Sequence, residues 1–188
     1  ANLTSRGVSG NMGQADILEV FHIYAQESSS SQEKTRILAQ FPISDVTTDR
    51  TNGDIPLSGN VSFYLRMFNA EQSQTTPKDF TLTIQPVSRS WEEGLGLDME
   101  NYSDIGASNW LSASEGVLWT TEGGDYLDDP SSSFSQTFDT GFENLEVDIT
   151  PLVEQWINSA GNILGSKDNY GVGVFLTSSQ ETASVSYY

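Results

Sequence analysis

The side chains best suited to bind or transform a ligand gather in residues 90–130. This segment contains three of the four tryptophans, ten acidic residues and no basic residue. Aromatic rings can stack on the faces of sugar rings, and carboxylates bind divalent cations or transfer protons. The composition therefore indicates three kinds of chemistry: a carbohydrate site, a calcium site or a hydrolytic pair of carboxyl groups.

Two of the tryptophans are the better candidates for a carbohydrate site, because Ser, Asn, Gly and Glu surround them in the sequence. The predicted carbohydrate-binding set is Trp110, Trp119, Asn109 and Asp125. The alternative is that both rings are packing anchors, which is the usual role of a large aromatic side chain. Trp91 follows a predicted strand, and we expect it in the core.

Acidic residues of the same segment could supply the oxygen ligands that Ca²⁺ prefers. The candidates are Asp98, Glu100, Asp104, Asp125, Asp128 and Asp129. Their spacing is not that of an EF-hand loop, because Ser103 stands where that loop has its glycine and Asn109 where it closes with glutamate. A structural calcium ion is therefore one hypothesis, and a solvated acidic face is the alternative. No other cofactor is expected.

Enzymatic activity is not expected. Glycoside hydrolysis needs two carboxyl groups at a defined separation, and adjacent positions such as Glu92 and Glu93 do not establish one. The chain has no cysteine and a single histidine, His22, on which any Ser-His-Asp triad would depend. His22 belongs to an alternating, strand-like run, where a structural role is the stronger interpretation.

The charge of the chain limits its partners. The formal net charge is −18, and residues 91–188 carry 17 acidic side chains against one basic side chain, Lys167. Nucleic-acid binding needs basic patches that displace counterions, so this function class is excluded. No apolar run approaches the length of a membrane span, so no membrane partner is expected. The acidic half favours cation binding or a solubilising surface.

The elements that would position these side chains are mainly strands. Alternation of apolar and polar residues predicts strands near 17–24, 35–43, 61–68, 80–87, 134–138, 145–149 and 170–176. Within the third strand, Leu65 and Met67 should face the core, and Tyr64 and Phe68 the opposite side. Gly173 should mark a place where a neighbour comes close.

One short helix interrupts this pattern at about 150–159. Thr150 and Pro151 can start it, and one apolar stripe contains Leu152, Val153, Trp156 and Ile157. Trp156 is therefore expected in the core. Arg36 and Arg66 lie inside predicted strands and are expected to form structural ion pairs.

The order of elements predicts an all-β sandwich of about eight antiparallel strands with this one short helix. Residues 17–188 would form a single domain. Residues 1–16, which are polar and rich in Gly and Asn, are interpreted as an N-terminal arm or an irregular edge. Residues 45–59 are interpreted as a long loop.

Several of these elements resemble, in order, the DNRLRE family of jelly-roll modules. Asp148-Ile149-Thr150-x-Leu152-Val153-x-x-Trp156 resembles the family signature D-V-T-x-L-V-x-x-W, and Tyr170-Gly171-Val172 its N-Y-G-L-x-L strand. Arg36-Ile37-Leu38 with Phe41 is similar to its R-x-L-x-x-F strand, and Trp91 with Glu93 to its W-x-E element. The resemblance covers residues 36–176. It implies a jelly-roll β-sandwich, truncated at its C-terminal end because the family continues past the final tyrosines.

Four segments resemble uncharacterised structural proteins of tailed marine bacteriophages. These segments are residues 18–21, 36–42, 69–77 and 90–100. The resemblance implies a virion location and a role in capsid decoration, a tail or a fibre, through contacts with other virion proteins or with copies of itself. The alternative is an extracellular or cell-surface carbohydrate-binding module, which would bind a surface glycan through residues 90–130 and use calcium.

Overall fold

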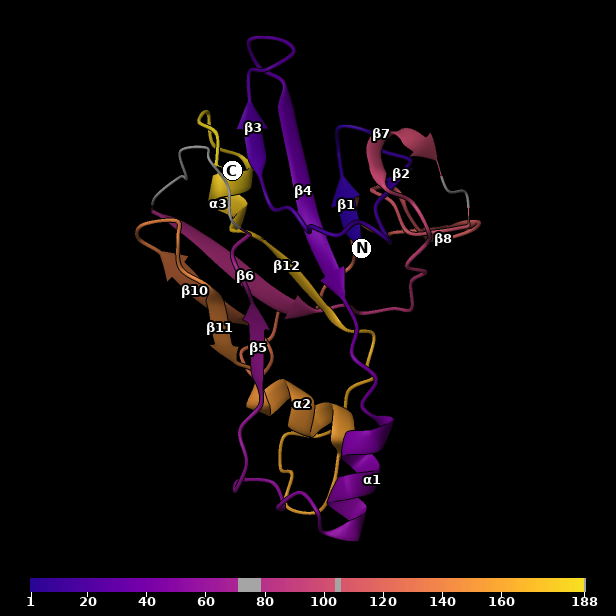
Figure 1. Cartoon of the computed structure of the whole chain (residues 1–188), viewed down its shortest axis with the longest axis vertical. Coiled ribbons are helices and arrows are strands. Elements are labelled where there is room, and N and C mark those ends of the chain that lie inside the picture. Colours follow the sequence, from indigo (N-terminus) through magenta and orange to yellow (C-terminus); the bar gives the residue numbers. More distant parts are fainter. Residues whose placement is uncertain (71–78, 104–105, 188) are drawn as a thin grey trace.

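A six-stranded antiparallel sheet forms the centre of the computed structural model, which describes residues 1–70, 79–103 and 106–187, with the backbone alone for 98–103 (Figure 1). Five strands lie in the order β1-β4-β12-β6-β10, and β3 pairs with the first residues of β4. The bounds of the six strands are β1 Asn2–Thr4, β3 His22–Tyr24, β4 Gln32–Ala39, β6 Phe80–Pro86, β10 Phe134–Phe138 and β12 Val172–Leu176.

A second layer covers one side of this sheet, which we call the inner face. The layer consists of the strands β5 (Tyr64–Met67) and β11 (Leu145–Asp148), which pair with each other, and the helix α2 (Thr150–Ile157). Leu65 and Val147 from this layer form one buried cluster with Ile84 and Val174 from the sheet. The arrangement is sandwich-like and confirms the predicted all-β class.

The chain between β6 and β10 covers the opposite side, the outer face, and we call residues 90–130 the outer cover. It contains β7 (Asp98–Ser103), which pairs with β2 (Gly10–Asn11), and a hairpin of β8 (Ser112–Ser114) and β9 (Val117–Leu118). Figure 1 shows β2, β7 and β8 beside β1. A second buried cluster fills this side of the sheet, and its members are Leu3, Leu38, Val87, Trp110, Ala113 and Trp119.

The long-range strand pairs are nested in the sequence. β4 pairs with β12, β5 pairs with β11, and β6 pairs with β10. The chain therefore runs out through β4, β5 and β6 and returns through β10, β11 and β12. β12 also pairs with β6, so that Val174 lies opposite Ile37 on one side and Ile84 on the other. The outer cover is the connection at the turning point of this path.

The N-terminal residues belong to the sheet. β1 is an edge strand in which Leu3 lies opposite Arg36 of β4, and Asn2, Leu3 and Thr4 are fully buried. Leu3 belongs to the outer-face core, so these residues are an integral part of the central sheet.

Residues 44–52 form the helix α1 (Ser44–Asn52), where the sequence predicted a loop. Threonine and aspartate are poor helix formers, and the segment has no apolar stripe. A long-range contact compensates for this low helix propensity. The buried Arg50 donates to both carboxylate oxygens of Glu154 in α2, at 3.0 and 2.9 Å. The prediction was wrong because this partner lies far away in the sequence.

The predicted helix is confirmed as α2, with Trp156 buried in the inner-face core. It ends at Asn158, which has the left-handed backbone conformation that closes helices. A third helix, α3 (Ser178–Glu181), begins with a capping box formed by Thr177 and Gln180. The described residues therefore contain three helices, whereas one was predicted.

The predicted strands exist, but several are shorter than expected. The run 17–24 forms a strand only as β3, and Ile17 is 57% exposed. In β5 the predicted faces are confirmed, since Leu65 is buried while Tyr64 and Phe68 are exposed. The close neighbour expected at Gly173 of β12 is also found, because a Cβ atom there would lie 2.1 Å from the Tyr126 ring. That ring packs directly on the backbone of β12.

Candidate functional site

The two tryptophans of the predicted carbohydrate site are buried beneath the outer cover. Trp110 and Trp119 are each only 6% exposed, and both belong to the outer-face core. Trp119 donates its indole N–H to the carbonyl of Asn109 at 2.8 Å. Sugar stacking needs an accessible ring face. The structure therefore corrects this prediction: both rings are packing anchors, the alternative considered from the sequence.

The two polar members of the predicted carbohydrate set hold turns of the outer cover. The Asn109 side-chain oxygen accepts from the backbone N–H groups of Leu111 and Ser112, both at 2.9 Å. Asp125 accepts from the backbone N–H groups of Thr120 and Thr121 at 2.9 and 2.8 Å. Burial raises the pKa of Asp125, but these hydrogen bonds outweigh it, so its pKa lies below the ordinary value. Both side chains are engaged within the fold.

Arg36 links the outer cover to the sheet and to α3. Its guanidinium forms a two-pronged ion pair with Glu181, at 2.9 and 2.5 Å, and donates to the carbonyl of Gly123 at 3.1 Å. It also lies 5.1 to 5.7 Å from the ring centroids of Phe175, Trp110 and Tyr126. Burial lowers the pKa of Arg36, but the pairing with Glu181 outweighs it and raises the pKa. The predicted structural ion pairs of Arg36 and Arg66 are both found, the latter with Glu146.

Asn11 is a structural residue that the sequence did not reveal. It is fully buried, and its amide donates to the carbonyls of Glu93 and Ser108, both at 2.9 Å. Its oxygen accepts from the backbone N–H groups of Gly13 and Gly96. One side chain thus ties the N-terminal segment to both ends of a loop in the outer cover. No local pattern marks it, because three of its partners lie more than eighty residues away.

The predicted calcium ligands are not brought together where the structure describes them. Asp128 accepts from Gln85 and Ser133, and Asp129 pairs with Lys167 at 2.8 Å and accepts from Ser131 and Ser132. Lys167 and Ser131 hold the pKa of Asp129 well below its ordinary value. Among the described residues, no group of three acidic or His side chains could hold a metal ion. Three further predicted ligands fall outside the described side chains: Asp98, Glu100 and Asp104.

An open groove of about 700 Å³ lies on the inner face of the sheet, and we call it the inner groove. Its floor is apolar and comes from four strands through Ile37, Leu82, Phe138 and Val174. One wall is the segment 16–21, which precedes β3. The other wall contains the end of β5 and the turn between β10 and β11. Ile37, Phe138 and Val174 of this floor belong to the buried inner-face core, so the accessible apolar surface of the groove comes from Leu82 and from the rim.

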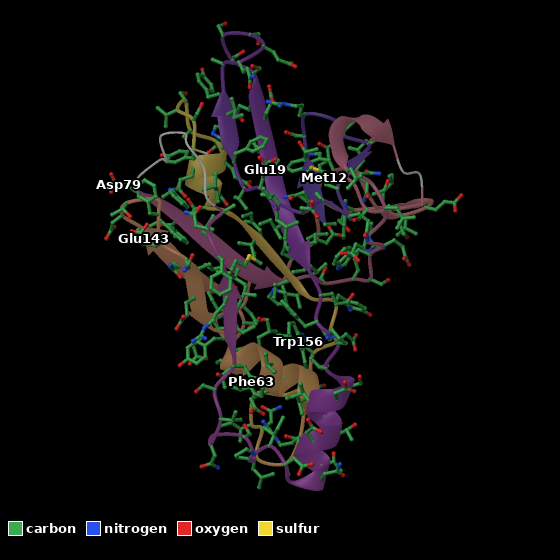
Figure 2. The ribbon with its side chains drawn as sticks, in the orientation of Figure 1. Met12, Glu19, Phe63, Asp79, Glu143 and Trp156 are labelled. Atoms are coloured by element: carbon green, nitrogen blue, oxygen red, sulfur yellow. The ribbon has the colours of Figure 1, made fainter. Side chains whose placement is uncertain are left out.

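The rim of the inner groove is apolar and acidic. Ile17, Leu18 and Phe68 line it and are 57%, 40% and 81% exposed. Three carboxylates also line it, from Asp16, Glu19 and Glu143, and no basic residue of the described part of the chain does. Figure 2 shows Glu143 at the β10–β11 turn and Glu19 beside β4, in two different walls. Exposed apolar side chains around a hollow are typical of protein contact sites.

Glu143 is the most constrained of the three carboxylates. Its Oε1 atom accepts from the backbone N–H groups of Asp139 and Thr140, at 3.1 and 2.9 Å. Its Oε2 atom is buried and has no hydrogen-bond partner among the described residues. Burial raises the pKa of Glu143, but the hydrogen bonds from this turn outweigh it and lower the pKa to about 2. Glu143 is therefore ionised at neutral pH and contributes negative charge to the rim.

The sequence contained a signal for the inner groove. Ile17, Leu18, Val20 and Phe21 form an apolar run that the alternation rule assigned to a strand. The residues 17–21 instead pass as irregular chain along the sheet, so their side chains line a hollow. The second signal is Phe68, which follows β5 directly. It is a large apolar residue that was predicted to face away from the core.

No protein-family model, curated protein or solved structure matches this chain. Within the part of the chain that the structure describes, no helix combines the length and the apolar character needed to cross a bilayer.

Proposed function

We propose that this protein is a non-enzymatic structural protein that acts through protein–protein contacts, as a jelly-roll component of a bacteriophage particle. The observation that carries the proposal is the inner groove. Its apolar floor is part of the sheet itself, and its rim exposes Ile17, Leu18 and Phe68. Burying such a surface against a partner is favourable by about 25 cal/mol per Å² of apolar area.

The nested strand pairing supports the jelly-roll part of the proposal. A jelly roll is an eight-stranded double sheet that can be described as one long hairpin rolled up, so that successive pairs alternate between the two sheets. In this chain β4·β12 and β6·β10 belong to one sheet, and β5·β11 to the other. The innermost pair of such a hairpin would fall in residues 90–130. That stretch is instead the outer cover, which leaves part of the inner face open.

The virion part of the proposal depends on the resemblance of four sequence segments to phage structural proteins. The carbohydrate-binding alternative is weaker, because its two aromatic rings, Trp110 and Trp119, are buried. The acidic surface of the chain suits a protein that must stay soluble until it meets its partner.

Mass spectrometry and immunogold labelling of purified particles of the phage that encodes this chain would test the proposal. The expected result is a fixed copy number per particle and labelling at one kind of position. A protein found only in the soluble lysate, or a gene surrounded by glycan-degrading rather than capsid and tail genes, would contradict it. So would selective binding of the purified protein to a polysaccharide on a glycan array.

A further inference from the structure

The character of the inner groove restricts what can occupy it, and this inference rests on the proposed protein-contact function. Its accessible lining is mainly apolar: Leu82 is partly exposed at the floor, and Ile17, Leu18 and Phe68 are exposed at the rim. A polar occupant would lose hydrogen bonds to water without replacement. The occupant must therefore insert apolar side chains.

The rim adds a charge requirement. Asp16, Glu19 and Glu143 line the inner groove, and among the described residues no basic side chain does. Glu143 has a buried oxygen without a hydrogen-bond partner among the described residues. The three carboxylates attract positive charge, and hydrogen bonds from a cationic donor to a carboxylate are stronger than neutral ones. Basic side chains on the occupant meet this requirement.

A second copy of this chain could offer few basic side chains to the inner groove. Six of its eight basic residues already form ion pairs within the fold: Arg6, Arg36, Arg50, Arg66, Arg89 and Lys167. Two copies, each with a net charge of −18, would also repel each other. A second copy is therefore disfavoured as the occupant.

Residues 71–78, which connect Ala70 to Asp79, lie outside the described part of the chain. Their sequence is EQSQTTPK, and it contains no large apolar side chain. It does not provide the apolar groups that the floor of the inner groove requires.

We propose that the inner groove receives a segment of a different protein in which large apolar side chains lie next to Lys or Arg. The apolar side chains contact Leu82 and the exposed apolar side chains of the rim. The basic side chains approach the carboxylates of Asp16, Glu19 and Glu143. The acidic surface of the chain also speeds the encounter with a basic partner, so association weakens as salt is added.

Three synthetic peptides provide the probes. One alternates Leu with Lys, one alternates Leu with Glu, and one alternates Ser with Lys. Fluorescence anisotropy of labelled peptides measures affinity, and amide chemical shifts of the 20.6 kDa protein locate binding. We expect the Leu–Lys peptide to bind and to shift amides of residues 16–21 and 141–145. The affinities of the Leu–Glu and Ser–Lys peptides should each be lower by about tenfold or by a larger factor.

Matched variants separate the inner groove from general attraction to an acidic protein. Glu143→Gln keeps the Oε1 acceptor but removes the charge, and should weaken binding about tenfold. Its control is Glu115→Gln, an exposed position in the outer cover. Leu18→Ser should weaken binding roughly fivefold, whereas Leu164→Ser, which changes an equally exposed leucine in the loop after α2, should not.

Equal effects of Glu143→Gln and Glu115→Gln, or equal binding of the Leu–Glu peptide, would overturn the inference. A dimer that Leu18→Ser abolishes would also overturn it, because a second copy would then be the occupant. That last result would leave the proposed protein-contact function standing. Absence of the protein from phage particles would remove the virion function whatever the peptides do.

Discussion

The two faces of the six-stranded sheet are covered in different ways. On the outer face, Trp110 and Trp119 of the outer cover pack with Leu3 and Leu38 in one cluster. All four side chains are almost completely buried. On the inner face, a groove lies between the segment 16–21 and the end of β5, with Ile17 and Phe68 exposed on its rim. The tryptophans that are typical of a binding site therefore lie on the outer face, where they are buried.

The difference shows that residue types alone do not identify a functional surface. Asn109 and Asp125 of the outer cover accept hydrogen bonds from backbone groups, and Asn11 of β2 donates to a backbone carbonyl of the cover. The inner groove, by contrast, has exposed apolar side chains on its rim. The position of these residue types in the fold, and not their presence in the sequence, therefore decides their role.

The largest expected effect comes from removing an anchor of the closed face. Trp110→Ala should lower the free energy of unfolding by about 4 kcal/mol, because it leaves a cavity beneath the outer cover and removes the ring beside Arg36. Urea unfolding followed by circular dichroism measures this. The matched control is Phe68→Ala at the rim of the inner groove, which should change stability by less than about 0.5 kcal/mol. A loss below about 1 kcal/mol for Trp110→Ala would mean that the outer cover is not part of the core.

A pair of leucines compares the two faces directly. Leu38 is 1% exposed and faces the outer cover, whereas Leu82 is partly buried and lines the inner groove. Leu38→Ala should cost about 3 kcal/mol of stability, and Leu82→Ala about half as much, since fewer packed neighbours are lost. The midpoints of denaturant unfolding give both stability losses, provided that the variants and the wild type have equal m-values. Equal losses would show that the inner groove is as tightly packed as the closed face.

The smallest expected effect is the pH dependence that Glu143 contributes. Its pKa is lowered from 4.5 to about 2 in the folded protein, so its stabilising contribution is fully present above pH 4.5. This contribution is lost as the pH falls through about 2. Thermal unfolding at several pH values should therefore show a steeper loss of stability on acidification for the wild type than for Glu143→Gln. Parallel curves for the two proteins would mean that the turn does not hold the carboxylate.

Much of the fold could be predicted from local patterns. Alternation assigned Leu65 to the core and Tyr64 to solvent, and helical spacing assigned Trp156 to the core. These predictions succeed because a strand or helix with one buried face must repeat its apolar residues with the period of its backbone.

The remaining features depend on contacts between distant residues, which local patterns do not encode. The helix α1 is stabilised by the pair Arg50–Glu154, whose members are 104 positions apart. Asn11 meets its partners across 82 to 97 positions. The inner groove depends on how far β5 and β11 extend over the sheet. The sequence directed attention to residues 90–130 rather than to the inner groove, although Ile17 and Phe68 were visible as apolar residues.

Hydrogen–deuterium exchange of the free protein, resolved by mass spectrometry, tests most directly the claim that the outer cover is scaffold and the inner groove is the open face. The amides of Glu92, Trp119 and Gly123 donate to carbonyls within the outer cover at 2.7 to 2.9 Å. We predict that peptides from residues 107–126 exchange as slowly as those from β12, and that residues 16–21 exchange much faster. Fast exchange throughout 107–126, with β4 and β12 still protected, would contradict the account.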